Sequence, residues 1–484
     1  MSTLAARVLV FFASASILVL EILAGRMMAP YVGVTLESFT GIIGTVLAGI
    51  AIGSWLGGRL ADHYPPQRIL PIVLISGGLL ALLTYPIVTL VGPSSSAAPV
   101  DIVLLAAVSF FAPAAVLSAV TPTVTKIRLH TLAETGSVVG RLSAIATAGA
   151  IFGTFVTGFV LVAAWPSRTI TFIVGASLIL AGLLTATRLG TATAAMLIAS
   201  IGLAALATGA AVAAPSTCEY ETAYYCVNVD IDPDRASGRV LWLDTLRHSY
   251  VDLDDPTHLE FRYAQIFGAV LDTQLPEGPG NSLSIGGGGF TFPRYVSSIR
   301  PGGLNTVLEL DPAIVDIAVA ELGLDPSTLD IRTGDARVTL QEAPIGNYDV
   351  VIGDAFGGPA VPWHLTTREF AEEFASKLTS SGFYVLNLID YPPLGFARAQ
   401  TATLAAVFDH VAVVAPPDYF AGDRGGNFVL VASKAPLDLD ALSAALVEKG
   451  STAIAVSGAQ VEEFVGDAEV LTDDFAPVDQ LITN

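Results

Sequence analysis

The stretch SIGGGGFTFPRY, Ser284 to Tyr295, decides how the second half of this chain should fold. Four consecutive glycines follow a short apolar run and precede a segment that we expect to be helical from about Phe292. Gly286, Gly287 and Gly288 allow a tight turn and a close approach of the backbone to a ligand, and the amides of the following helix favour a carboxylate or phosphate. A strand, a glycine turn and a helix in this order are typical of a nucleotide-binding α/β domain.

Short β-rich runs alternate with helical segments after this turn. We expect helices over residues 312–322, 367–378 and 395–408, and strands in TVLELD, LDIRTGDA, YDVVIGDAF, GFYVLNLID, HVAVVA and NFVLVASKAP. Strands separated by helices of this length predict a parallel, doubly wound, Rossmann-like sheet. Upstream, VLWLD (240–244) and strands beginning near Tyr224 predict a small antiparallel β-hairpin subdomain.

Acidic residues end three of the expected strands. Glu309 ends the second strand, where a carboxylate accepts ribose hydroxyls. Asp335 ends the third strand, where its side chain or the backbone of Ala336 would meet an adenine, and Asp354 ends the fourth and should point into the cleft. Because the carboxyl ends of parallel strands form the ligand cleft, this order predicts an adenosyl site.

The composition divides the chain into an apolar part and an acidic part. Of 484 residues, 52% are hydrophobic and only 14% are charged. Residues 1–214 carry a net charge of +4 and the remainder carries −25, so a nucleic-acid partner is not expected for either part. We predict a transmembrane bundle over 1–214, the small β subdomain over 215–275 and the Rossmann-like domain over 276–484.

Seven apolar stretches in the first part are each close to the roughly 20 residues needed to cross a bilayer. They lie near residues 8–25, 40–60, 69–92, 99–121, 142–165, 169–187 and 192–214. Seven of the nine basic residues fall on one side of the alternation, which predicts a multi-pass membrane protein with a cytoplasmic N-terminus. With seven spans, the acidic part would be extracytoplasmic.

The only two cysteines, Cys218 and Cys226, lie just after the last expected span in STCEYETAYYC. In an oxidising compartment this pair predicts a local disulfide, with two unrelated buried thiols as the alternative. The stretch has too few ligands for a metal site, and no metal cofactor is expected.

The soluble part resembles the spermidine synthase family of aminopropyltransferases, and in particular its membrane-fused members with transporter-like helices. The matching segments are RVLWLD, DDPTHLEF, the glycine loop, VLELDPAIVDIA, GDAR and YDVVIGDAFGGPAVPWHLTTREF. In the bundle, GGRLADHYPPQR (57–68) is similar to a loop of major facilitator transporters.

This resemblance implies a transferase of polyamine biosynthesis. Its donor would be decarboxylated S-adenosylmethionine or S-adenosylmethionine, held at the glycine loop, Glu309, Asp335 and Ala336, and Asp354 would be the catalytic base. Glu260 matches a family glutamate, and His258 is a second candidate for contact with the small-molecule acceptor.

Three departures bear on the acceptor. Tyr225 replaces a glutamine of the family, Gly289 replaces an aspartate of its glycine loop, and Gly357 replaces a second aspartate. A diamine would lose two countercharges, so methyl transfer, or another acceptor lacking the double positive charge, is an alternative. A non-catalytic domain coupled to a transporter-like bundle is another, since adenosyl donors are cytoplasmic. The sequence leaves the oligomeric state open, with a homo-oligomer among the alternatives.

Overall fold

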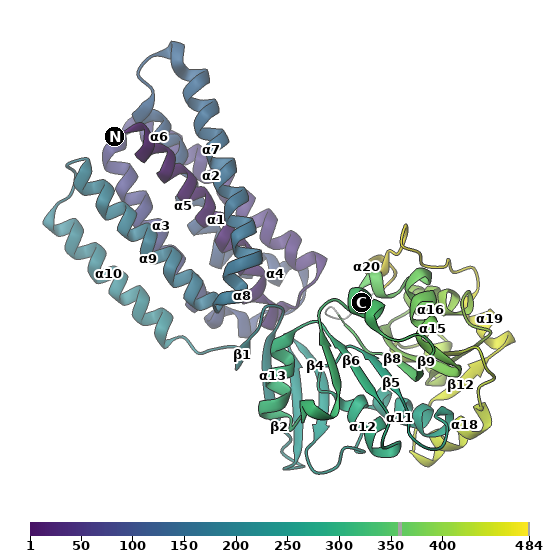
Figure 1. Cartoon of the computed structure of the whole chain (residues 1–484). Helices are drawn as coiled ribbons and strands as arrows, with labels where there is room; N and C mark the ends of the chain where they lie inside the picture. Colours follow the sequence, from purple (N-terminus) through teal and green to yellow (C-terminus); the bar gives the residue numbers. More distant parts are fainter. Residues whose placement is uncertain (357–360, 483–484) are drawn as a thin grey trace. The chain divides into compact units, whose positions relative to one another are not determined.

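A computed structural model describes residues 1–356 and 361–482. The chain forms two compact units (Figure 1). The first comprises Met1–Val227 and Leu243–Thr245, and the second comprises Asn228–Trp242 and Leu246–Asn484.

The first unit is a helix bundle, and in the described chain seven helical stretches are long and apolar enough to cross a membrane. The count expected from the sequence is therefore confirmed, although each stretch is longer than the apolar run that predicted it, except the last. The stretches are Thr3–Val32 (α1), Leu36–His63 (α2), Pro66–Ser94 (α3 with a 3-10 turn), Pro99–Arg128 (α4, α5 and α6), Leu132–Ala164 (α7 and α8), Ser167–Arg188 (α9) and Ala194–Ala213 (α10).

Small residues bring the helices of the bundle close together. On α2, a Cβ added to Gly49 would lie 2.9 Å from the carbonyl oxygen of Phe111, and one added to Gly53 would overlap the backbone of Ala115 on α5. Close backbone approach of this kind holds helices together where apolar surroundings give no hydrophobic driving force. Large apolar side chains such as Phe159 and Leu206 lie exposed on the bundle.

The cysteines close the segment that follows the bundle. Cys218 and Cys226 form a disulfide that spans β1 (Tyr220–Glu221) and the start of β2 (Cys226–Ile231), as the sequence predicted. A four-stranded sheet in the order β1-β2-β3-β4 includes these strands. It starts at Tyr220, earlier than expected, and continues through β3 (Gly238–Leu243) and β4 (Leu246–Asp252).

An eight-stranded sheet in the order β12-β10-β11-β9-β8-β5-β6-β7 forms the centre of the second unit. Five neighbouring strands are parallel, as predicted: β5 (Ser282–Ile285), β6 (Asn305–Glu309), β7 (Asp330–Thr333), β8 (Tyr348–Gly353) and β9 (Leu378–Asp390).

The expectation of a parallel sheet is wrong for its C-terminal edge. β11 (Gly426–Ser433) pairs antiparallel with both β9 and β10 (His410–Ala415), and β12 (Ile454–Ser457) pairs antiparallel with β10. Only residues 416–425 separate β10 from β11, which is shorter than a parallel crossover needs. The sheet is therefore mixed.

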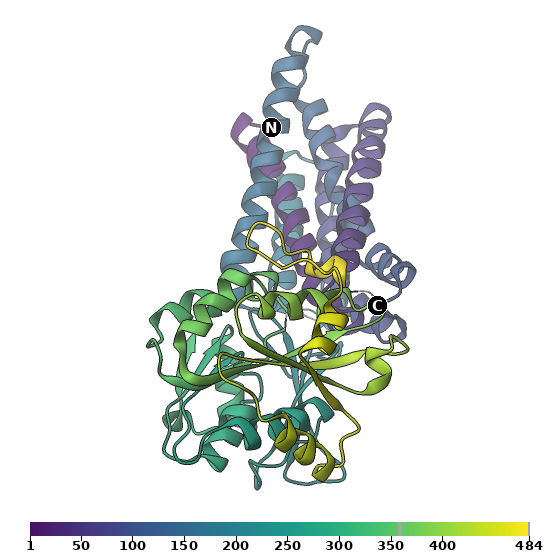
Figure 2. The same cartoon turned by 90° about the vertical axis from the view of Figure 1, so that its right-hand side faces the viewer.

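Helices cover both faces of this sheet, as Figure 2 shows. Successive residues of β8 alternate between the two layers, since Val351 belongs to one hydrophobic cluster and Val350 and Ile352 to the other. The first cluster includes residues of α15 (Arg368–Lys377), α16 (Gly395–Ala405) and α19 (Ala459–Val465); the second includes residues of α11 (Arg262–Gln274), α12 (Thr291–Ile299) and α18 (Leu439–Glu448). The sequence predicted α12, α15, α16 and α13 (Pro312–Glu321), but not α11, α18 or α19.

Candidate active site

Several predicted site residues lie at the end of β5, where the strand order of the sheet reverses. β5 pairs in parallel with β6 on one side and β8 on the other, so Ile285 lies opposite both Leu308 and Gly353. Gly286, Glu309 and Asp354 follow directly after these paired residues. The chain therefore brings the glycine loop and two of the predicted carboxylates to one edge of the sheet.

The glycine loop needs glycine for its conformation and for its packing. Gly286 and Gly288 have φ of 94° and 49°, in the left-handed region that other residues avoid. A Cβ on Gly286 would also lie 2.7 Å from the carbonyl oxygen of Asp354. The loop thus leaves a backbone surface, free of side chains, at the end of β5.

Glu309 holds this loop in place. Its Oε2 accepts the N–H groups of Gly287 and Gly288 at 2.8 and 3.2 Å, and its Oε1 accepts the N–H of Asp311 at 2.9 Å. Burial raises the pKa of Glu309, while these three N–H donors act in the opposite direction. Three of the roughly four acceptor positions of the carboxylate are filled by backbone N–H groups, and Glu309 is 6% exposed.

Asp335 has protein partners as well. Its Oδ1 accepts the N–H of Arg337 at 2.9 Å and so caps α14 (Ala336–Thr339), while its Oδ2 lies 3.0 Å from Nε2 of His364. Ala336 packs, partly buried, against the hydrophobic core beneath. His364 was not predicted as a site residue, and it comes from a separate short 3-10 turn, Trp363–Leu365.

Asp354 lies at the end of β8 with a hydrogen bond to each carboxylate oxygen. Its Oδ1 accepts the Nδ2 donor of Asn387 at 2.9 Å, and its Oδ2 accepts the hydroxyl of Tyr263 at 3.2 Å. Asn387 in turn accepts a hydrogen bond from Asn427 at 2.9 Å. Burial raises the pKa of Asp354 to about 6, although the two hydrogen bonds act in the opposite direction. A carboxyl group with a pKa near neutrality is suited to general base catalysis.

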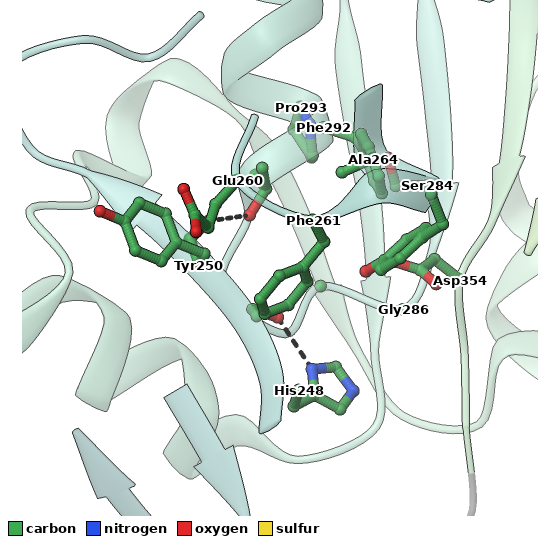
Figure 3. Close-up of a pocket in the computed structure, with 14 residues that line it drawn as sticks. His248, Tyr250, Glu260, Phe261, Ala264, Ser284, Gly286, Phe292, Pro293 and Asp354 are labelled. Carbon is green, nitrogen blue, oxygen red and sulfur yellow. Dashed lines mark hydrogen bonds between the residues drawn. The ribbon is translucent and has the colours of Figure 1, made fainter. Parts of the chain in front are cut away.

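Two cavities open onto Asp354. One is drawn in Figure 3, where Phe261, His248 and Asp354 face the same space next to Gly286. The other measures about 410 Å³. Both are lined by His248, Glu260, Phe261, Tyr263 and Asp354. Burial lowers the pKa of His248 to about 4, so this imidazole is neutral at pH 7.

The two predicted acceptor residues differ in position. Glu260 lines both cavities. His258 is not among the described residues that line either; its Nε2 lies 3.3 Å from Oε2 of Glu260 and its ring packs against Tyr250. His258 is thus placed to orient Glu260.

Two of the three positions at which the chain differs from the spermidine synthase family, Gly289 and Tyr225, lie within the described residues. A Cβ on Gly289 would lie 2.7 Å from Cβ of Ser249 and 3.1 Å from Val251, and the Gly289 N–H donates to the Ser249 hydroxyl at 3.1 Å. An aspartate would therefore require β4 to move. Tyr225 lies beside Cys226 and donates its N–H to Thr222 at 2.9 Å. Gly357 lies outside the described residues.

Two arginines line the larger cavity beside its carboxylates. Arg247 and Arg262 line it together with Glu260 and Asp354, and the Arg247 guanidinium lies 4.8 Å from the centre of the Phe261 ring.

In the described chain, no group of three or more His, Cys, Asp or Glu side chains is arranged to hold a metal ion.

The residues that position Asp354 were missed from sequence. Asn387 is a polar residue within the apolar strand GFYVLNLID, and a buried amide of this kind needs a partner. That signal was available. Tyr263 had no comparable signal, because its partner is 91 positions away in the chain.

Comparisons with known proteins relate the second half of the chain to one group of enzymes. No protein-family model matches. Over 216 residues the chain is 29% identical to the polyamine aminopropyltransferase of Vibrio vulnificus, covering 42% of this chain and 70% of that protein. A shorter match, 28% identical, covers 29% of this chain and 53% of the polyamine aminopropyltransferase of Chromobacterium violaceum.

A solved structure agrees with these sequence matches. The crystal structure of a probable spermidine synthase from Corynebacterium glutamicum matches with a TM-score of 0.50 and 27% identity, covering 54% of this chain and 97% of that one. The resemblance found in the sequence is confirmed: this chain joins seven long apolar helices to an α/β unit similar to polyamine aminopropyltransferases and spermidine synthases.

Proposed function

We propose that the α/β unit is a transferase that moves an aminopropyl group from an adenosyl-sulfonium donor to an amine, with Asp354 as the base. The observation that carries this proposal is the position of Asp354, which borders both the glycine loop and the larger cavity and has a pKa raised to about 6. The relatives named polyamine aminopropyltransferase support the reaction class.

The donor site would be the edge formed by the glycine loop, Glu309, Asp335 and Ala336. The side-chain-free loop and the carboxylate of Glu309 beside it fit the ribose of decarboxylated S-adenosylmethionine or S-adenosylmethionine. Asp335, whose side chain is 42% exposed, leaves its outer edge open to an adenine amino group.

Asp354 would accept the proton that the acceptor amine loses as its nitrogen bonds to carbon. The carbon–sulfur bond breaks in the same step, and its electron pair stays on sulfur as a neutral thioether. A bound sulfonium supplies a good leaving group, so the residues mainly position the reactants and remove the proton. Tyr263 and Asn387 would fix the carboxylate toward the reacting nitrogen.

The acceptor would be an amine without a second positive charge. Gly289 leaves no room for a carboxylate, and Arg247 and Arg262 line the larger cavity. A distal ammonium group would meet guanidinium groups there, whereas a distal carboxylate would be paired. We expect 4-aminobutyrate to be preferred over 1,4-diaminobutane, and Arg247→Gln with Arg262→Gln to reverse the order. A wild-type preference for the diamine would contradict this assignment.

The test of the transferase uses the full chain in detergent micelles. Calorimetry should detect binding of methylthioadenosine, weakened about tenfold or more in Glu309→Gln and unchanged in the matched control Asp316→Asn, an exposed residue on α13. Product mass after incubation with each donor distinguishes aminopropyl from methyl transfer. If the wild-type chain did not bind methylthioadenosine, both the aminopropyl-transfer and the methyl-transfer hypotheses would be contradicted, and a non-catalytic domain would be the remaining alternative.

We further propose that the bundle spans a membrane with its N-terminus in the cytoplasm and the α/β unit on the other side. Seven candidate spans and the basic residues of the loops support this orientation. The disulfide of Cys218 and Cys226 supports it independently, because disulfides persist in oxidising compartments.

A further inference from the structure

A small cavity lies within the helix bundle. Its volume is about 50 Å³, and it lies where the start of α1, the end of α6 and the start of α7 meet. Three of its lining residues are arginines and none is acidic; the lining comprises Thr3, Ala6, Arg7, Arg128, Ser137, Val138, Arg141 and Leu142.

The three arginines lack countercharges. In the described chain none of them forms an ion pair, and the buried Nε of Arg7 has no hydrogen-bond partner. Arg128 donates to Oγ1 of Thr3 at 2.9 Å and to the carbonyl oxygen of Met1, which holds its guanidinium at the cavity. An orphaned buried N–H costs free energy unless a ligand satisfies it.

Other basic residues of the bundle are satisfied differently. Lys126 pairs with Asp62 at 2.6 Å, and the Arg59 guanidinium lies 4.8 Å from the centre of the Trp55 ring. A topological preference for positive charge accounts for basic residues anywhere in these loops. It does not account for three guanidinium groups lining one cavity without an acid.

We propose that Arg7, Arg128 and Arg141 form a binding site for a phosphate group. Guanidinium groups bind phosphate oxygens through paired N–H donors, and three of them line this one cavity. The phosphate belongs either to an anionic lipid headgroup, which basic pockets between membrane helices bind, or to a free phosphate, which guanidinium groups bind through the same paired donors.

The test measures ligand-dependent thermal stability of the full chain in neutral detergent. One arm adds phosphatidylglycerol, with neutral diacylglycerol as its control; the other adds inorganic phosphate, with chloride at equal ionic strength. A rise in Tm in the first arm alone identifies a lipid, and a rise in the second identifies free phosphate. No rise in either arm overturns the proposal.

Variants assign the effect to the cavity. Arg141→Gln should weaken the apparent affinity about tenfold, and because Arg141 is exposed this variant should fold. Arg7→Lys keeps the charge but loses the paired donors, so it should weaken binding as well. Arg68→Gln, which removes a charge outside the cavity, should bind as the wild type does. Equal loss in Arg68→Gln and Arg141→Gln would show a general charge effect and contradict the site.

Discussion

The helix bundle and the α/β unit use glycine for different purposes. On α2 of the bundle, Gly49 and Gly53 have ordinary helical backbone and serve only to admit α5. At the end of β5, Gly286 and Gly288 take positive φ and create a turn that faces a cavity. Glycines four residues apart therefore indicate helix packing, whereas consecutive glycines after a strand indicate a site.

The same contrast extends to charge. Most of the acidic residues of the chain follow the bundle, and those at the strand ends are held by specific donors, as Glu309 and Asp354 are. The bundle instead places three arginines, Arg7, Arg128 and Arg141, around one small cavity. We therefore expect substitutions at the packed glycines of the bundle to change its stability, and substitutions at the strand ends of the α/β unit to change its activity.

The largest effect should come from Asp354→Asn. The amide keeps the shape of the side chain but cannot accept a proton, so turnover should fall about 10²–10⁴-fold. Binding of methylthioadenosine should persist, as calorimetry on the full chain would establish. Turnover within a few-fold of wild type would refute the role of Asp354 as base.

Gly53→Ala tests the packing side of the comparison. The added methyl group would overlap the Ala115 backbone, which should destabilise the bundle by about 1–3 kcal/mol. Thermal unfolding followed by circular dichroism in micelles measures the change. Gly44→Ala is the matched control on the same helix, since nothing lies within 4 Å of its Cβ position. Equal Tm values for the two variants would contradict the packing role.

The pH profile should show the raised pKa of Asp354. A base must be deprotonated to act, so kcat/KM should rise with pH up to about 6 and level off above it, with a tenfold loss for each pH unit well below that value. Tyr263→Phe removes a hydrogen bond that lowers this pKa, so the midpoint should move to higher pH. A midpoint that stays in place in the variant would exclude Asp354 as the titrating group.

The smallest expected effect concerns the side of the membrane on which the α/β unit lies, and it is measured as a difference in cysteine labelling. In intact cells, a membrane-impermeant thiol reagent should label Cys218 and Cys226 only after reduction, because both lie in the disulfide. Labelling that requires cell lysis even after reduction would place the α/β unit on the cytoplasmic side.

Sequence reasoning succeeded where the signal is local. Each apolar run predicts its helix without reference to any other, and the strand–glycine–helix pattern at Ser284 predicts β5 and α12 in the same way. It failed where pairing is distant: the antiparallel edge depends on β11 joining β9, and the hydrogen bonds of Asp354 depend on Tyr263 and Asn387. Such contacts are fixed by tertiary packing, which the periodicity of one segment does not encode.

The chain of amides behind Asp354 also determines where a proton is able to go. Asn387 and Asn427 orient the carboxylate, yet neither amide gains or loses a proton near neutral pH. Burial raises the pKa of Tyr263 well above its usual value, so its hydroxyl stays protonated as well. In the proposed reaction, Asp354 would therefore lose its proton through the open cavity, by the same route that the product takes.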